Sequence, residues 1–166
     1  CQVFRNNGDE TFTDIAAEAG VENFGFTKGV TWGDYDNDGD PDLYISRMGQ
    51  PNVLLANEGV TGDATWSFRD VATEAGVLEP EMSFPVWFWD FDNDGALDLF
   101  VAAYGAGIAD LSADVLHHKH SDLEHATLYK GDGKGGFQNV TAQFGLQRHM
   151  APMACNFGDL DNDGDL

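Results

Sequence analysis

The chain has 166 residues and carries 29 acidic side chains against eight Lys and Arg, which gives a formal net charge of −21. This imbalance argues against nucleic acid as a partner, because phosphate contacts require clustered basic residues. The hydrophobic fraction of 42% is high enough for a packed core, so we expect a folded domain. Such acidity fits an extracellular, periplasmic or cell-surface protein, and no apolar run is long enough to predict membrane insertion.

Two short apolar elements open the chain and recur further on. The first ends in glycine, and the second begins with Phe and reads Phe-x-Asp-Val or a close variant. They occur in the same order at residues 3–8 and 12–15, 54–59 and 68–71, and 128–133 and 137–140. Repetition in a fixed order at this period is typical of a repeat array or a β-propeller.

Acidic loops alternate with these pairs of elements. Residues 34–42 read D-x-D-x-D-G-x-x-D, residues 90–98 repeat the pattern, and residues 159–166 repeat all of it except the ninth position. In each copy the first aspartate lies 14 residues after a glycine, which is Gly20, Gly76 or Gly145. The loops begin 56 and then 69 residues apart, so the repeating unit is much longer than the loop.

The loop pattern predicts a calcium site. Carboxylates at positions 1, 3 and 5 alternate along a tight turn, and the glycine at position 6 lets position 9 return to the same point. A flexible cage of carboxylate oxygens suits a hard divalent cation and favours Ca²⁺ over Mg²⁺. Position 7 is Asp40, Ala96 or Asp165, so its ligand is expected to be the main-chain carbonyl.

The segments around the loops predict strands, which distinguishes the pattern from an EF-hand. Position 12, a bidentate glutamate in EF-hands, is Ile45 or Val101 here. Strands are predicted to enter the loops at 29–33, 84–89 and 153–158, and to leave them at 43–47 and 97–104. With the two recurring elements, each unit has four short antiparallel strands, the make-up of a propeller blade. Helical turns are expected only at 13–19, 70–75 and 108–118.

The fold class is therefore expected to be all-β, a partial β-propeller divided into parts of four blades. Residues 1–28 are the end of one blade, 29–83 and 84–152 are nearly whole blades, and 153–166 begin the next. The chain should be a segment of a longer array, whose remaining blades are its nearest partners. Cys1 and Cys155 are too few for a disulfide framework and are either paired or ordinary buried thiols.

Three further features allow two interpretations each. The insert at 105–125 is either a transition-metal or ligand site or, as we favour, a polar surface insertion; it carries His117, His118, His120 and His125. Trp32, Trp87 and Trp89 flank the loops and are expected to pack between blades rather than to stack on sugars. Asn139-Val-Thr141 matches an N-glycosylation sequon, which matters only in a eukaryotic secreted protein.

Catalysis by the loop carboxylates is the competing chemical interpretation. Paired carboxylates can act as general acid and base, but every loop acid is assigned here as a metal ligand and recurs in each unit. No Ser-His-Asp, Cys-His or phosphate-loop arrangement is present in the sequence. We therefore expect a non-catalytic chain.

Taken together, the Phe-x-Asp-Val element, the Ala-Gly-Val segment and the Gly-Asp-Tyr-Asp-Asn-Asp-Gly-Asp-Pro-Asp-Leu stretch resemble FG-GAP (VCBS-type) repeats. These are the blades of integrin-α-type seven-bladed propellers, and the sequence is most similar to the ASPIC/UnbV, or cartilage acidic protein-like, group. The resemblance covers nearly the whole chain apart from the insert at 105–125.

The resemblance implies a secreted or surface-exposed, calcium-binding propeller that binds a protein or carbohydrate ligand or works in adhesion. The alternative it leaves open is a propeller portion of an extracellular polysaccharide-degrading enzyme. The calcium ligands of the family correspond here to Asp34, Asp36, Asp38, Asp40 and Asp42, to Asp90, Asp92, Asp94, Ala96 and Asp98, and to Asp159, Asp161, Asp163 and Asp165.

Overall fold

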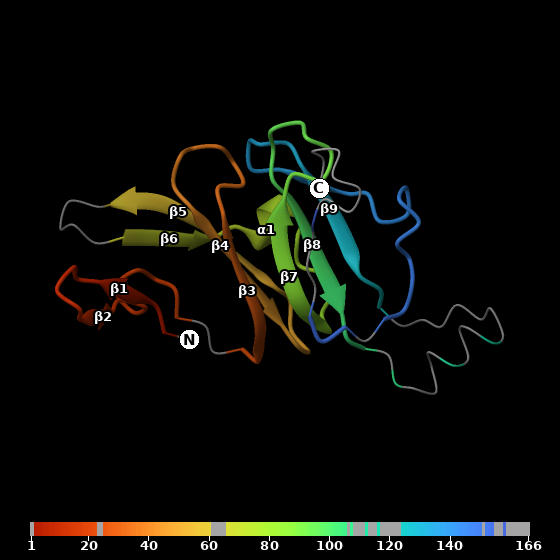
Figure 1. Cartoon of the computed structure of the whole chain (residues 1–166), viewed down its shortest axis with the longest axis horizontal. Helices are drawn as coiled ribbons and strands as arrows, with labels where there is room; N and C mark the ends of the chain where they lie inside the picture. Colours follow the sequence, from red (N-terminus) through yellow and green to blue (C-terminus); the bar gives the residue numbers. More distant parts are fainter. Residues whose placement is uncertain are drawn as a thin grey trace.

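The computed structural model describes residues 2–22, 25–60, 66–105, 107, 112, 116, 124–150, 152–154 and 158. It contains three antiparallel sheets that follow one another along the chain and lie side by side (Figure 1). The predicted all-β fold is confirmed, since the one α-helix bounded among the described residues is the single turn α1 (Ala72–Ala75). No helix of the described part is long and apolar enough to cross a membrane.

The two larger sheets each have four strands in sequence order. The first sheet consists of β3 (Thr27–Gly33), β4 (Asp42–Arg47), β5 (Val53–Val60) and β6 (Trp66–Asp70). The second consists of β7 (Ser83–Trp89), β8 (Asp98–Ala103), β9 (Thr127–Gly131) and β10 (Phe137–Asn139). Within each sheet, every strand pairs antiparallel with its neighbour in sequence. This meander is the four-stranded unit that the repeats predict.

The third sheet is a hairpin of β1 (Phe4–Asn6) and β2 (Phe12–Asp14). It corresponds to the last two strands of each larger sheet, because the same backbone contact closes all three. In each case the residue just after the last strand donates its N–H to a carbonyl in, or just before, the strand paired with it. The three bonds are 2.8–2.9 Å long and run from Ile15 to Val3, from Val71 to Leu54, and from Val140 to Leu128. The predicted equivalence of these elements is confirmed.

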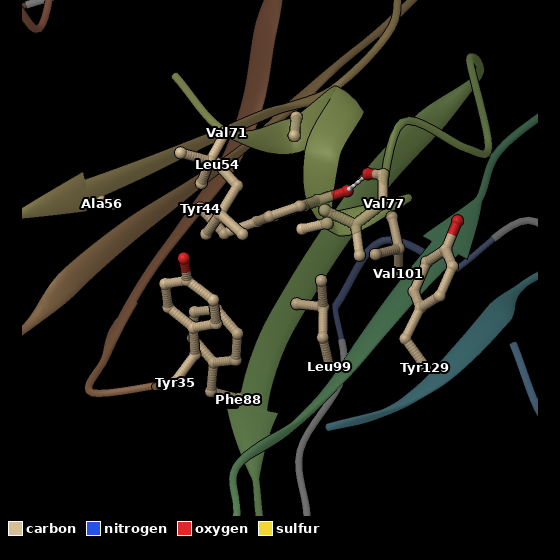
Figure 2. Close-up of a cluster of buried hydrophobic side chains, with 12 residues drawn as sticks. Tyr35, Tyr44, Leu54, Ala56, Val71, Val77, Phe88, Leu99, Val101 and Tyr129 are labelled. Atoms are coloured by element: carbon tan, nitrogen blue, oxygen red, sulfur yellow. Dashed lines mark hydrogen bonds between the residues drawn. The ribbon is translucent and has the colours of Figure 1, made fainter. Parts of the chain in front are cut away.

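Strands β4 and β5 are buried on both faces. Leu43 and Leu55 belong to the core shared with residues 15–21, which follow the β1–β2 hairpin, whereas Tyr44 and Leu54 belong to the core shared with the second sheet. Figure 2 shows the second of these cores, with Tyr44 and Leu54 on one side and Leu99 of β8 on the other. Because successive side chains of a strand point to opposite faces, this burial places the first sheet between two neighbours, as in a stack of blades.

Hydrogen bonds link the first sheet both to the second sheet and to the connection between α1 and β7. The hydroxyl of Tyr44 donates to the carbonyl of Val77 at 2.7 Å (Figure 2). The hydroxyl of Ser46 donates to the carbonyl of Phe84 at 2.6 Å. Strands β3 and β7 approach so closely that a Cβ at Gly29 would lie 2.6 Å from that same Phe84 carbonyl oxygen, so only glycine fits there. The sheets are therefore held in one fixed relation.

Some predicted elements differ from the structure or lie outside the described residues. The helical turn expected at 13–19 is a hydrogen-bonded turn in which Ala19 N–H donates to the Ile15 carbonyl at 2.9 Å; it does not propagate into a helix. Of the helix expected at 108–118, only Ser112 and Leu116 are described, and both are helical. The third acidic loop, half of the predicted strand at 153–158 and both cysteines lie outside the described residues.

The tryptophans that flank the loops have different surroundings. Trp87 and Trp89 pack on Phe100, with ring centroids 4.6 and 6.3 Å apart. Trp32 is 49% exposed and meets the edge of Phe68 on the side of the sheet that faces the β1–β2 hairpin. Trp87 and Trp89 thus pack within their own sheet, Trp32 is only partly covered, and the expected packing between blades stays a prediction.

Because β5 is buried on both faces, we predict that its adjacent residues Leu54 and Leu55 contribute similarly to the free energy of unfolding. Leu54→Ala and Leu55→Ala should each lower the free energy of unfolding by about 2–5 kcal/mol, because each opens a cavity in a different core. Val60→Ala, at the 55% exposed end of the same strand, is the control and should cost less than about 1 kcal/mol. Urea unfolding measures all three. A near-neutral Leu55→Ala would show that the first sheet packs on one face only.

Candidate metal centres

The ninth residue of each described loop anchors it. Asp42 and Asp98 begin β4 and β8 and are fully buried. One oxygen of Asp42 accepts the N–H of Tyr35 at 3.2 Å, and the other accepts the N–H of Asn57 in β5 at 2.8 Å. In the same way Asp98 accepts the N–H groups of Phe91 and of Gly131 in β9, both at 2.9 Å. Each carboxylate therefore ties the start of its loop to the third strand of its sheet.

The first residue of each loop fixes the turn. Asp34 accepts the backbone N–H groups of Asp38 at 3.0 Å and Gly39 at 3.1 Å. Asp90 accepts those of Asp94 and Gly95 at 3.0 and 2.8 Å. These bonds require left-handed backbone at position 4, where Asn37 has φ 59° and Asn93 has φ 56°, and at the glycine of position 6. Asn and Gly are the residues that adopt this conformation most readily.

Positions 1, 3 and 9 converge, as the sequence predicts. One carboxylate oxygen from each of Asp34, Asp36 and Asp42 lies within 4.8 Å of the others, and Asp90, Asp92 and Asp98 form the equivalent group. Position 5 uses one carboxylate oxygen within its own loop, because Oδ1 of Asp38 accepts the N–H of Asp40 at 2.9 Å and Oδ1 of Asp94 accepts that of Ala96 at 3.0 Å. Asp38, Asp40 and Asp94 are not in the convergent groups.

Burial makes the ionised carboxylates of the first loop unfavourable. Burial, reinforced by the charges of Asp36 and Asp38, raises the pKa of Asp42 to about 6. Burial also raises the pKa of Asp36, with the neighbouring Asp38 adding to the effect. In addition, Oδ1 of Asp36 is buried and has no hydrogen-bond partner among the described residues. An unpaired buried carboxylate oxygen is unfavourable, and a bound cation at this point would satisfy it.

The second loop differs because it has a cation of its own. The ammonium group of Lys130, in β9, pairs with Asp92 and lies 2.7 Å from Oδ2 of Asp94. Its hydrogen bond lowers the pKa of Asp94. Burial still raises the pKa of Asp98. The sequence patterns do not identify Lys130, because it reaches the loop from a strand that is distant along the chain.

The two described loops lie next to each other at one end of the sheets. In Figure 1 the connections that follow β3 and β7 both occupy the upper edge of the molecule. The side-chain amide of Asn37 donates to the carbonyl of Gly95 at 3.3 Å, which links the two loops directly. His125, the one insert histidine within the described residues, places Nδ1 3.0 Å from the carbonyl of Ala126 and is not part of either group.

Comparison with known proteins agrees with this arrangement. A family model described as FG-GAP-like repeat matches residues 1–45 and 90–166. The chain belongs to this family. Among curated proteins, cartilage acidic protein 1 of Homo sapiens is 33% identical over 138 residues, and that of Xenopus tropicalis is 32% identical over 133 residues. Each match covers 78% of this chain and 20% of the relative, so this FG-GAP-like chain spans about a fifth of the length of the curated relatives.

The left-handed backbone at position 4 gives a prediction that needs no metal. Asn37→Ala should lower the free energy of unfolding in chelator by about 1–2 kcal/mol, because alanine is strained at φ 59°. Asn37→Gly removes the same bond to Gly95 without that strain and should cost clearly less. Urea unfolding of the two variants separates the contributions. Equal losses would mean that the bond to Gly95, rather than the backbone conformation, accounts for the requirement.

Proposed function

We propose that this FG-GAP-like chain is a non-catalytic, calcium-binding segment of a seven-bladed propeller in an exported protein that binds a protein or carbohydrate ligand. The observation that carries the proposal is the first loop, where Asp36 keeps a buried, unpartnered oxygen within a convergent group of three carboxylates. A hard divalent cation is the ligand that such an oxygen-only donor set suits.

The residues assigned to hold calcium are those of the repeated pattern. In the first loop they are Asp34, Asp36 and Asp42, with Asp38 and the main chain of Asp40 completing the set. In the second they are Asp90, Asp92, Asp94, the main chain of Ala96, and Asp98. Asp159, Asp161, Asp163 and Asp165 are assigned by pattern alone, because they lie outside the described residues.

Calcium acts in this proposal as a structural clip. When bound, it supplies positive charge to carboxylates that otherwise repel one another. The chain's own bonds have already set the position of those carboxylates: Asp42 and Asp98 are held by backbone N–H groups from the loop and from the third strand. The ion would therefore stiffen the end of the blade at which the two loops meet.

The proposed location follows from charge and from the relatives. A formal net charge of −21 keeps a protein soluble and poorly suited to nucleic acid. The names of the matched relatives refer to cartilage and to acidity. Extracellular calcium is abundant enough to occupy even weak sites of this kind, which supports a calcium-dependent propeller outside the cell.

Bound-metal analysis and thermal melts in calcium and in chelator test the proposal. The chain should bind calcium and melt higher with it, since one site at a hundredfold excess over Kd stabilises by about 2.7 kcal/mol. Asp36→Asn should remove one ion and reduce the calcium-dependent rise in Tm. Glu18→Gln, an exposed acid outside the loops, should change neither. An unchanged ion count in Asp36→Asn would remove the first loop from the assignment.

A further inference from the structure

The two described loops share one motif but face different residues from the third strand of their sheets. Tyr129 pairs with Leu99 in the second sheet as Leu55 pairs with Leu43 in the first. The next residue along β9 is Lys130, and the next along β5 is Ala56. A lysine thus occupies the blade position that holds a buried alanine in the preceding blade.

The lysine contacts carboxylates of the second loop whose counterparts in the first loop are proposed to bind a metal. Its ammonium group pairs with Asp92, the third position of the loop, and with Asp94, the fifth. The ring centroid of Phe91 lies 5.8 Å from the same nitrogen. The first-loop counterpart of Asp92 is Asp36, whose Oδ1 is buried and unpartnered among the described residues. Among the described residues, the second loop therefore has a paired cation and the first loop has none.

We propose that Lys130 is a built-in counter-cation of the second loop, which makes that loop a weaker calcium site than the first and lets it hold its shape without the ion. This inference rests on the proposed function, because it assumes that the first loop binds calcium.

Charge repulsion and competition for carboxylate oxygens are the physical reasons. Calcium that used the Asp92 oxygen paired with Lys130 would have to displace the ammonium, and an ammonium that stayed nearby would repel the divalent ion. The pairs are about one-third exposed, at 32% for Lys130 and 33% for Asp92, so the lysine can swing into solvent. We expect a modest penalty, roughly tenfold in Kd, as suits ion pairs that are partly screened by water.

Calorimetric titration with CaCl₂ tests the inference on the full 166-residue chain. Asp36→Asn and Asp161→Asn silence the first and third loops, so that the second is measured alone. In this background Lys130→Met, which keeps the aliphatic stem, should tighten calcium binding about tenfold. Lys130→Arg keeps the charge and should remain weak. Lys134→Met removes the same charge from the exposed β9–β10 turn and should change Kd less than about twofold.

A melt in chelator provides the second measurement. Lys130→Met should lower Tm more than Lys134→Met, because Asp92 and Asp94 lose their counter-charge; Lys130→Gln replaces it if the methionine variant does not fold. The inference is overturned if Lys130→Met and Lys134→Met have equal calcium affinities in the background with the first and third loops silenced, provided that the first loop of the unmodified chain binds calcium. No calcium binding by the chain with all loops intact would instead overturn the proposed function, so the two failures are distinguishable.

Discussion

The buried carboxylate at the ninth loop position is the interaction on which each blade depends. Asp42 and Asp98 are fully buried, and their burial is tolerable only because each oxygen accepts a backbone N–H. One of those donors lies in the loop and the other in the third strand, so a single side chain fixes the loop against the sheet. The acidic motif therefore has a structural role that needs no metal, and a bound cation would complete a geometry that the backbone bonds already set.

Packing between the sheets fixes the position of each sheet relative to its neighbours. Tyr44 and Leu54 enter one core while their neighbours Leu43 and Leu55 enter another, so the first sheet cannot shift without disturbing both sides. The contact from Asn37 to the Gly95 carbonyl joins the loops of adjacent sheets at the same edge. An ion that made one loop more rigid would thus also restrict the motion of the next loop, so the two loops would not behave as independent sites.

The sequence predicts most of this arrangement because repetition supplies information that a single copy lacks. Three copies of the loop identify positions 1, 3 and 9, which converge, together with position 5, which is not in the convergent groups, and the shared spacing assigns four strands to each unit. The third strand, expected in the element at 54–59, extends over Val53–Val60 as β5. Lys130 could not be found by spacing at all: its contact with Asp92 depends on the register of β8 and β9, which is a property of the folded sheet.

A repeated motif therefore does not imply equally strong sites. The second loop conserves the geometry of the first, since Asp98 and Asp90 make the same backbone bonds as Asp42 and Asp34. Its charge balance differs because Lys130 stands where the first blade has Ala56, outside the motif itself. If the loops bind calcium as proposed, substitution at this one strand position would change the affinity of a loop while leaving its proposed ligands in place. The residues that face a loop from its third strand should thus be read together with the motif whenever the strengths of such sites are compared.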